Sequence, residues 1–288
     1  MTRPTSWAAL LVAASAALAC SRGPRQAASP AEVRAVAADA LPTAPDDAAW
    51  ARAPVHTAAL MPQDVVEPTL RTPTTPTVDV QAITDGTRIA FRLSWATPAR
   101  SDRALPAVFS DACAVQLPAA AGPDVPNPVM GEAGRAVEIS YWRAAWQASV
   151  DGRPDTLAAL HPNAKVDHYP FESPSLAPGS PEQLAMANRY APARALGNAM
   201  AGPRRSPVED LVASGAGTLR SAARPLSSGK GAPTASGWSV VLVRPLPDGL
   251  KPGGRSVAAF AVWRGGAGEA GARKMRSGWI PLAVEARK

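Results

Sequence analysis

The sequence predicts a mainly β protein, an antiparallel β-sandwich with a long insertion of loops and short helices. Three observations favour this fold class. Several short segments have the alternation or the β-branched and aromatic content of strands. No long helical segments alternate with them, which argues against a parallel sheet. The 288-residue chain also holds 31 prolines, many of them in its middle, where they interrupt regular structure.

The predicted strands follow one another along the chain on both sides of this proline-rich middle. The Asp-Gly step at 85–86 lies between the first two and is a strong signal for a tight hairpin. The predicted strands are 77–83 (TVDVQAI), 87–95 (TRIAFRLSW), 136–142 (AVEISYW), 237–246 (GWSVVLVRPL), 255–265 (RSVAAFAVWRG) and 278–286 (GWIPLAVEA).

Residues 151–236 are expected to form a loop and short-helix insertion between strands of one domain. The segment 181–200 has a helical pattern. A second short helix is predicted over 206–215, because Ser206 is a good N-cap residue and Gly215 a good C-terminal residue.

The N-terminus has the layout of an export signal. Arg3 precedes an apolar stretch that is too short to cross a bilayer comfortably, and small residues follow it. We therefore expect residues 1–19 to be a signal peptide and residues 20–45 to be a flexible tether. The domain that folds should occupy residues 46–288.

Cys20 stands directly after the signal, and two processing routes fit it. The sequence "ALAC" (17–20) resembles a bacterial lipobox, in which Cys20 would be the acylated first residue and would anchor the protein to a membrane. Ala17-Leu18-Ala19 also satisfies the rule for soluble export, which would leave Cys20 an idle thiol. Both routes place the mature protein outside the cytoplasm, on the periplasmic side.

Composition limits the classes of function. The net charge of +7 and the pI near 10 are compatible with nucleic-acid binding, but the basic residues are scattered and an exported protein seldom meets nucleic acid. If Cys20 is acylated, Cys113 is the remaining thiol, which excludes an internal disulfide and zinc sites built on cysteine pairs. The absence of C-x-x-C-H excludes covalent c-type haem attachment.

No catalytic motif stands out. The sequence lacks H-E-x-x-H, G-x-S-x-G and P-loop patterns. His161, Asp167 and His168 lie close together in "HPNAKVDHYP" and His56 stands apart, but this spacing is more typical of polar loop residues than of a metal site. We expect the protein not to be an enzyme by itself.

Met130 and Lys274 are the candidates for a binding site. Met130 lies on a loop between Pro128 and Gly131, where a thioether, a soft metal ligand, can reach over a sheet edge. The alternative is ordinary packing on Trp142 or Trp146. Lys274 follows a glycine-rich hairpin and would ligate a metal only as a neutral amine, which burial favours. The alternative for Lys274 is a surface lysine.

An ordered series of segments runs along the chain. They are "DDAAWARAPVHTAALMPQ" (46–63), "VDVQAITDGTRIAFRLSWATP" (78–98), "FSDACAVQLP" (109–118), "VMGEAGRAVEISYWRAAWQ" (129–147), "LGNAM" (196–200), "SPVEDLVASGAGTLR" (206–220), "GWSVVLVRPL" (237–246) and "VAAFAVWRGGAGEAGARKMRSGWIPL" (257–282). Together these segments resemble a known family, the haem b-binding gamma subunits of ethylbenzene dehydrogenase, dimethyl sulfide dehydrogenase, selenate reductase and chlorate reductase, which share a haem-binding domain of the cytochrome c-552/DMSO reductase type.

The resemblance implies a β-sandwich that holds one non-covalent haem b between axial Met and Lys ligands. The family's Met-Gly step matches Met130-Gly131, and its lysine before a Ser-x-Trp step matches Lys274, with Ser277 and Trp279 in register. It also implies an electron carrier in a complex with molybdenum and iron–sulfur subunits, the redox partners of a respiratory oxidoreductase. Met275 is expected to point away from Lys274 if both lie on one strand. The competing hypothesis is a cofactor-free β-sandwich lipoprotein that binds a small ligand or carbohydrate.

Overall fold

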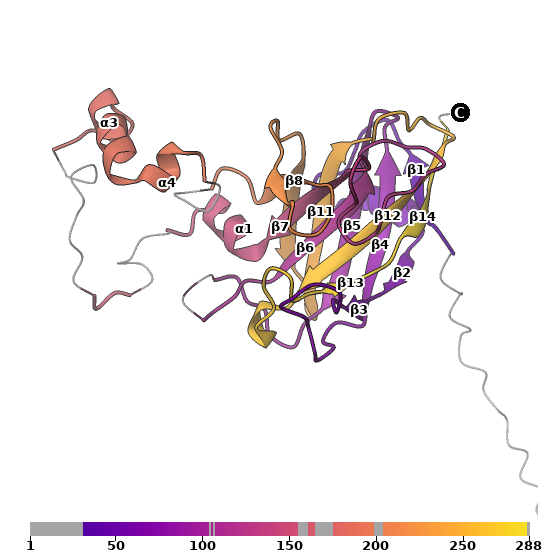
Figure 1. The fold of residues 1–288 in the computed structure, drawn as a ribbon, viewed down its shortest axis with the longest axis horizontal. Coiled ribbons are helices and arrows are strands. Elements are labelled where there is room, and N and C mark those ends of the chain that lie inside the picture. The colour runs from indigo at the N-terminus through magenta and orange to yellow at the C-terminus, as the bar shows by residue number, and fades with distance from the viewer. Residues whose placement is uncertain are drawn as a thin grey trace, which may run out of the picture.

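The computed structural model describes residues 31–286 except for 104, 106, 155–160, 165–174 and 199–203. The expected signal peptide and Cys20 lie outside the described residues, as do His168 and Asp167. In the described part of the chain, 14 strands are joined by hydrogen bonds into one sheet that folds back on itself as a sandwich (Figure 1). The predicted mainly β sandwich is confirmed.

The strand order is β10-β11-β5-β4-β1-β14-β12-β6-β7-β8-β9, with β2 paired to β4, and β13 paired to both β12 and β3. The strands are β1 (Val33–Ala37), β2 (His56–Ala59), β3 (Met61–Pro62), β4 (Thr77–Thr84), β5 (Arg88–Ala96), β6 (Ala112–Pro118), β7 (Val137–Arg143), β8 (Val208–Ala213), β9 (Arg220–Ser221), β10 (Ser228–Pro233), β11 (Gly237–Pro245), β12 (Arg255–Trp263), β13 (Met275–Arg276) and β14 (Ile280–Val284).

β12 belongs to both layers of the sandwich. Its first half, residues 255–258, pairs with β14, whereas residues 259–263 pair with β6. We call the sheet from β10 to β14 the first layer, and the sheet of β12, β13, β3 and β6 to β9 the second layer. The long β12 therefore holds the two layers together.

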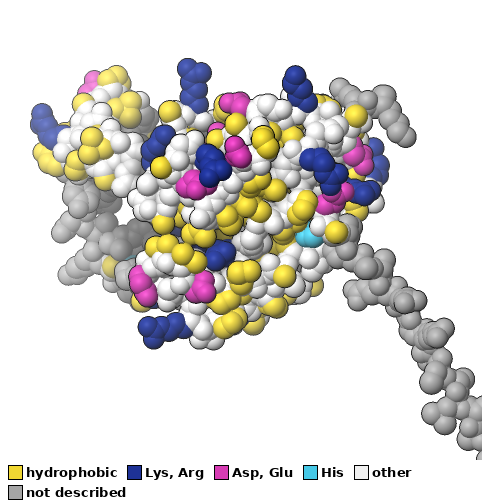
Figure 2. Space-filling model, turned by 45° about the vertical axis from the view of Figure 1, so that its right-hand side comes forward, with side chains coloured by type: hydrophobic (Ala, Val, Ile, Leu, Met, Phe, Trp, Pro, Cys, Tyr) yellow, Lys and Arg dark blue, Asp and Glu magenta, His cyan; other side chains and the backbone are white. Residues whose placement is uncertain are grey.

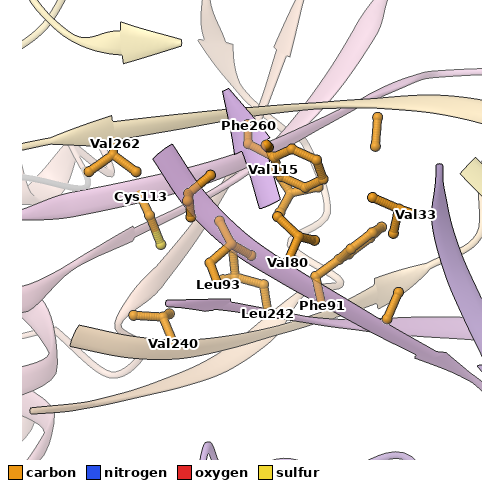
Figure 3. Close-up of a cluster of buried hydrophobic side chains, with 14 of the residues drawn as sticks. Val33, Val80, Phe91, Leu93, Cys113, Val115, Val240, Leu242, Phe260 and Val262 are labelled. Carbon is orange, nitrogen blue, oxygen red and sulfur yellow. The ribbon is translucent and has the colours of Figure 1, made fainter. Parts of the chain in front are cut away.

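The main core lies between the two layers. Figure 3 shows side chains from both of them meeting there, among them Phe91 and Leu242 from the first layer and Val115 from the second. Cys113 is fully buried in the same core and is not in a disulfide, and burial raises the pKa of its thiol. The sandwich is therefore stabilised by apolar packing, as the cysteine content predicts.

Helices are few and lie outside the sandwich. α1 (Ala144–Val150) follows β7, and the short 3₁₀ turns are η1 (Ala48–Arg52) and η3 (Gly265–Ala267). α3 (Pro181–Tyr190) and α4 (Pro192–Ala195) project from the sheets, as Figure 1 shows. The side-chain oxygen of Ser180 caps α3 by accepting a hydrogen bond from the Gln183 amide.

Two expectations about this topology are wrong. Residues 33–37 are not part of a flexible tether, because β1 pairs in parallel with β4 on one side and with β14 on the other. The sandwich is thus mixed at β1 and antiparallel elsewhere in the described strands.

The second helix expected over 206–215 is also wrong. This segment forms β8, which pairs with β7 and β9. The expected short helices of the insertion are present as α3 and α4, but β8, β9 and β10 also fall inside 151–236, so the segment contributes three strands to the sheet as well.

Candidate functional site

A cavity of about 420 Å³ lies on the outer face of the second layer, on the side away from the main core. Side chains alternate between the two faces of each strand. On β6, Cys113 and Val115 point into the core, whereas Ala114 and Gln116 line the cavity. Both faces of β6 are therefore covered, which explains why every residue from Ala112 to Pro118 is buried.

The floor of the cavity is built from aligned residues of neighbouring strands. Arg276, Ala261, Ala114 and Tyr141 form one row across β13, β12, β6 and β7. Because the two central side chains are alanines, open space is left between the larger side chains at the ends. Three strand spacings separate the ends of this row, or about 14 Å.

Loops form the walls of the cavity. They are residues 63–66, 128–130, 216–219 and 271–274. Most of the lining side chains are apolar, and none of the described residues that line the cavity is an aspartate or a glutamate. The two cationic side chains that line the cavity are Lys274, from a wall loop, and Arg276, from the floor.

Met130 enters the cavity from the side of β7 and β8. Its backbone is in the left-handed region, with φ of 64°, and its carbonyl accepts a hydrogen bond of 2.8 Å from the Gly215 amide. The side-chain amide of Gln116, on the cavity floor, donates to the Pro128 carbonyl. Hydrogen bonds thus hold the loop that carries Met130 to β6 and to the segment that follows β8.

Gly131 explains why the chain can turn so close to the sheet. Its φ is 76°, and a Cβ atom at this position would lie 2.9 Å from the Arg135 carbonyl and 3.0 Å from the Ala213 carbonyl. Glycine is the residue that fits both requirements. The Met-Gly step therefore has a structural reason in addition to its place in the resemblance.

Lys274 enters from the opposite side, just before β13. Its ammonium group lies 5.4 Å from the centroid of the Trp263 ring, and its carbonyl accepts a hydrogen bond of 2.9 Å from the Gln63 amide. Burial, together with the charge of Arg276, lowers the pKa of Lys274 from 10.5 to about 8. Lys274 is therefore not an ordinary surface lysine.

The structure brings Met130 and Lys274 to the same cavity. Met130 packs beside an apolar cluster that contains Trp263, whereas Trp142, one of its alternative packing partners, lies in the main core. Met275 is 1% exposed and also packs into the main core, so it points away from Lys274 as expected.

Sequence reasoning missed Gln63, which ties two of the cavity loops together. Its side-chain amide donates to the carbonyls of Val66 and Ala272, and its side-chain oxygen accepts from the amides of Val65 and Val66. Gln63 is 3% exposed, so these bonds are made away from solvent. Since its backbone amide also bonds Lys274, it positions the lysine.

The Ser277 and Trp279 side chains have positioning contacts as well. The Ser277 hydroxyl accepts from the Phe260 amide and donates to the Gly278 carbonyl. The indole N–H of Trp279 donates to the carbonyl of Pro126, in the loop that leads to Met130. Trp279 therefore links the segment that follows β13 to the loop that carries Met130.

The other candidate residues lie elsewhere. His56 is buried on β2 and does not line the cavity, and His161 is exposed on a loop. Among the described residues, no three His, Cys, Asp or Glu side chains gather as a metal site. The described residues also include no helix long and apolar enough to span a membrane.

The surface charge agrees with the expectation of scattered basic residues. On the face in Figure 2, Lys and Arg side chains are spread out and interspersed with Asp and Glu, while hydrophobic side chains gather toward the middle. No continuous basic stripe of the kind that tracks a nucleic acid is visible on this face.

One comparison with known proteins agrees with the resemblance seen in the sequence. The family model described as ethylbenzene dehydrogenase matches residues 47–186. A comparison with curated proteins found no match.

Among solved structures, a family 9 carbohydrate-binding module from Caldicellulosiruptor kristjanssonii is similar in two complexes. The complex with cellotriose has 9% identity and a TM-score of 0.38, and covers 88% of this chain and 95% of that chain. The complex with glucose has 7% identity and a TM-score of 0.40, with coverage of 89% and 96%. Likeness at this level gives no information on ligands.

Proposed function

Since residues 47–186 match the ethylbenzene dehydrogenase family, we propose that this chain is the electron-transfer subunit of an oxidoreductase complex and binds one haem b. Met130 and Lys274 would be the side chains that hold its iron. The observation that carries the proposal is that these two side chains, distant in sequence, enter one apolar cavity from opposite sides.

The residues of the cavity fit this cofactor. An apolar wall suits a flat hydrophobic ring, and the cavity volume lies within the usual range for small-molecule sites. Met130 offers a thioether, a known axial ligand of haem iron. Lys274 has its pKa lowered to about 8 by burial, so the neutral amine that a metal requires is readily formed.

The proposed ligand pair explains why the chain would not be an enzyme by itself. Haem b, when bound, supplies a one-electron Fe(III)/Fe(II) couple. If Met130 and Lys274 both held the iron, the site would leave no position for oxygen or a substrate. The thioether of Met130 favours the ferrous state and raises the potential.

The partners follow from this role. A one-electron carrier needs a donor and an acceptor, and we propose that one of these is formed by the molybdenum and iron–sulfur subunits of a respiratory enzyme.

We also propose export, with acylation of Cys20 anchoring the protein to the membrane. The stretch between Cys20 and β1 would then span at most about 47 Å, even fully extended.

Absorption spectra of the exported protein, oxidised and dithionite-reduced, test the assignment. The intact chain should show a low-spin haem b spectrum. Met130→Ala and Lys274→Ala should each lose or shift it, while the matched controls Met186→Ala on α3 and Lys230→Ala on β10 should leave it unchanged.

Other outcomes are equally decisive. An unchanged spectrum in Met130→Ala would exclude Met130 as a ligand. A low-spin, six-coordinate spectrum retained in Lys274→Ala would point to His56, His161 or His168 instead. A folded, colourless protein that takes up no added haem would favour the ligand-binding lipoprotein.

A further inference from the structure

Arg276 lines the cavity from β13, in the same row as the two alanines of the floor. Its side chain is 14% exposed, and its Nε is buried without a hydrogen-bond partner among the described residues. A guanidinium has five N–H donors, and leaving a buried donor unpaired is costly. Arg276 is therefore placed at a cost that the apo fold does not explain.

The ion pair of Arg276 does not remove this cost. Its Nη2 lies 3.7 Å from the Oδ1 of Asp64, which is beyond hydrogen-bonding distance. The Asp64 side chain is 73% exposed, and ion pairs with exposed partners contribute little.

The other charged side chain that lines the cavity beside Arg276 is also cationic. Lys274 is two residues earlier and lines the same cavity, as alternation along a strand predicts. No aspartate or glutamate is among the described lining residues. A cavity with positive charge and an apolar floor is complementary to a ligand that is apolar over most of its surface and carries an acidic group at one edge.

We propose that Arg276 binds a carboxylate of the molecule that occupies the cavity, and so fixes the edge at which the acidic groups of that molecule lie. This inference rests on the proposed function, under which the carboxylate is a propionate of haem b. The planar fork of a guanidinium pairs with a carboxylate through two parallel hydrogen bonds. Arg276 is then a positioning residue that does not touch the iron.

The test compares two probes that differ in their carboxylates. The apo protein and its variants are titrated with haemin and with haemin dimethyl ester, and the dissociation constants are measured from absorbance. Arg276→Gln should weaken haemin binding about 10- to 100-fold and leave binding of the ester within about 2-fold. Arg276→Lys should recover part of the haemin affinity, because it restores the charge without the fork.

The matched control is Arg273→Gln, since Arg273 is exposed, lies in the same segment and does not line the cavity. It should bind both probes like the unaltered protein. Melting temperatures of the apo variants establish that each is folded. The low-spin spectrum should persist in Arg276→Gln at saturating haemin, which separates loss of the carboxylate contact from loss of an iron ligand.

Several results would overturn the proposal. Equal losses for haemin and its ester, or no loss for either, would show that Arg276 does not recognise a carboxylate. If the unaltered protein binds neither haem probe, oleate serves as a second carboxylate. Binding of oleate that depends on Arg276 would support the carboxylate site while refuting the haem function, and no binding of oleate would refute both.

Discussion

Burying the Lys274 ammonium group costs free energy when the cavity holds no ligand. Burial disfavours its charged form, and Arg276 adds like-charge repulsion, so the pKa of Lys274 falls from 10.5 to about 8. At neutral pH the apo protein must therefore hold a charged amine where a neutral group would be more stable. Such a cost is typical of a residue kept for binding and not for folding.

We predict that Lys274→Met makes the apo protein more stable at pH 7, by about 1 to 2 kcal/mol after allowance for partial solvent access. Because the pKa is lowered on folding, the unfolded chain binds more protons between pH 8 and 10.5, and the stability of the unaltered protein rises with pH over this window. The advantage of the variant should be complete below pH 8 and absent above 10.5. Urea unfolding at several pH values measures it.

Lys230→Met is the control for this experiment, since Lys230 is exposed on β10. Its effect on stability should be small and should not vary between pH 8 and 10.5 in the same way. If Lys274→Met were destabilising at pH 7, the amine would have to be stabilised by contacts other than those described.

The residues of the site differ in how far the sequence could predict them. Met130 and Lys274 were identified through the resemblance, since by themselves a loop methionine and a lysine after a hairpin carry little information. Arg276 had a weaker signal, because it shares a strand face with Lys274. Gln63 had none, since its hydrogen bonds depend on a loop that is distant in sequence.

At the scale of elements, the cavity depends on alanines in β6 and β12. Ala114 and Ala261 are cross-strand partners on the outer face, whereas Ala258 and Phe260 of β12 pack into the main core. The same strand thus combines a filled inner face with an open outer one. Replacing alanine by leucine should have opposite effects on the two faces.

We predict that Ala261→Leu abolishes or weakens haem binding more than 10-fold and leaves the melting temperature of the apo protein unchanged or higher. The leucine side chain would enter empty space and add apolar contacts there. Haemin titration and thermal unfolding measure the two effects.

Ala258→Leu is the opposite case, because Ala258 has no exposed surface in the core. Overpacking there should destabilise the fold by about 1 to 3 kcal/mol. If Ala261→Leu bound haem with unchanged affinity, the site would have to lie elsewhere.

The segment that forms β8 shows why local sequence patterns were insufficient to predict its secondary structure. Val208, Leu211 and Val212 have the spacing of a helical face, and Ser206 resembles an N-cap. The Ser206 hydroxyl does accept a hydrogen bond from the Val208 amide, but it does so at the start of a strand. Pairing with β7 decides the conformation, and this tertiary contact is not visible in the local sequence.

At the scale of the whole molecule, the alternation of apolar residues predicted the sandwich, because strands with one or two buried faces impose that pattern. It did not predict the parallel pairings. β1 reads VRAVA within an alanine-rich stretch that resembles a tether or a helical turn. Its Val33 and Ala35 are nevertheless buried, at 1% and 0% exposure.

β1 fills a gap in the first layer, since it is the strand that joins β4 to β14. Without it, the inner edges of both strands would have unpaired backbone groups. We therefore predict that a chain starting at residue 40 is less stable than one starting at residue 31 by about 3 to 5 kcal/mol, from lost side-chain burial and lost strand pairing. The corresponding fall in melting temperature is on the order of 10 °C.

The same comparison tests whether the strand serves the site as well as the fold. β14 is continuous with the segment that holds Lys274 and Arg276, since Ser277 and Trp279 lie between β13 and β14. Loss of β1 should therefore loosen that segment and also weaken haemin binding. Equal melting temperatures and equal affinities for the two chains would mean that β4 and β14 hold their positions without β1, and that the segment before residue 40 acts as a tether after all.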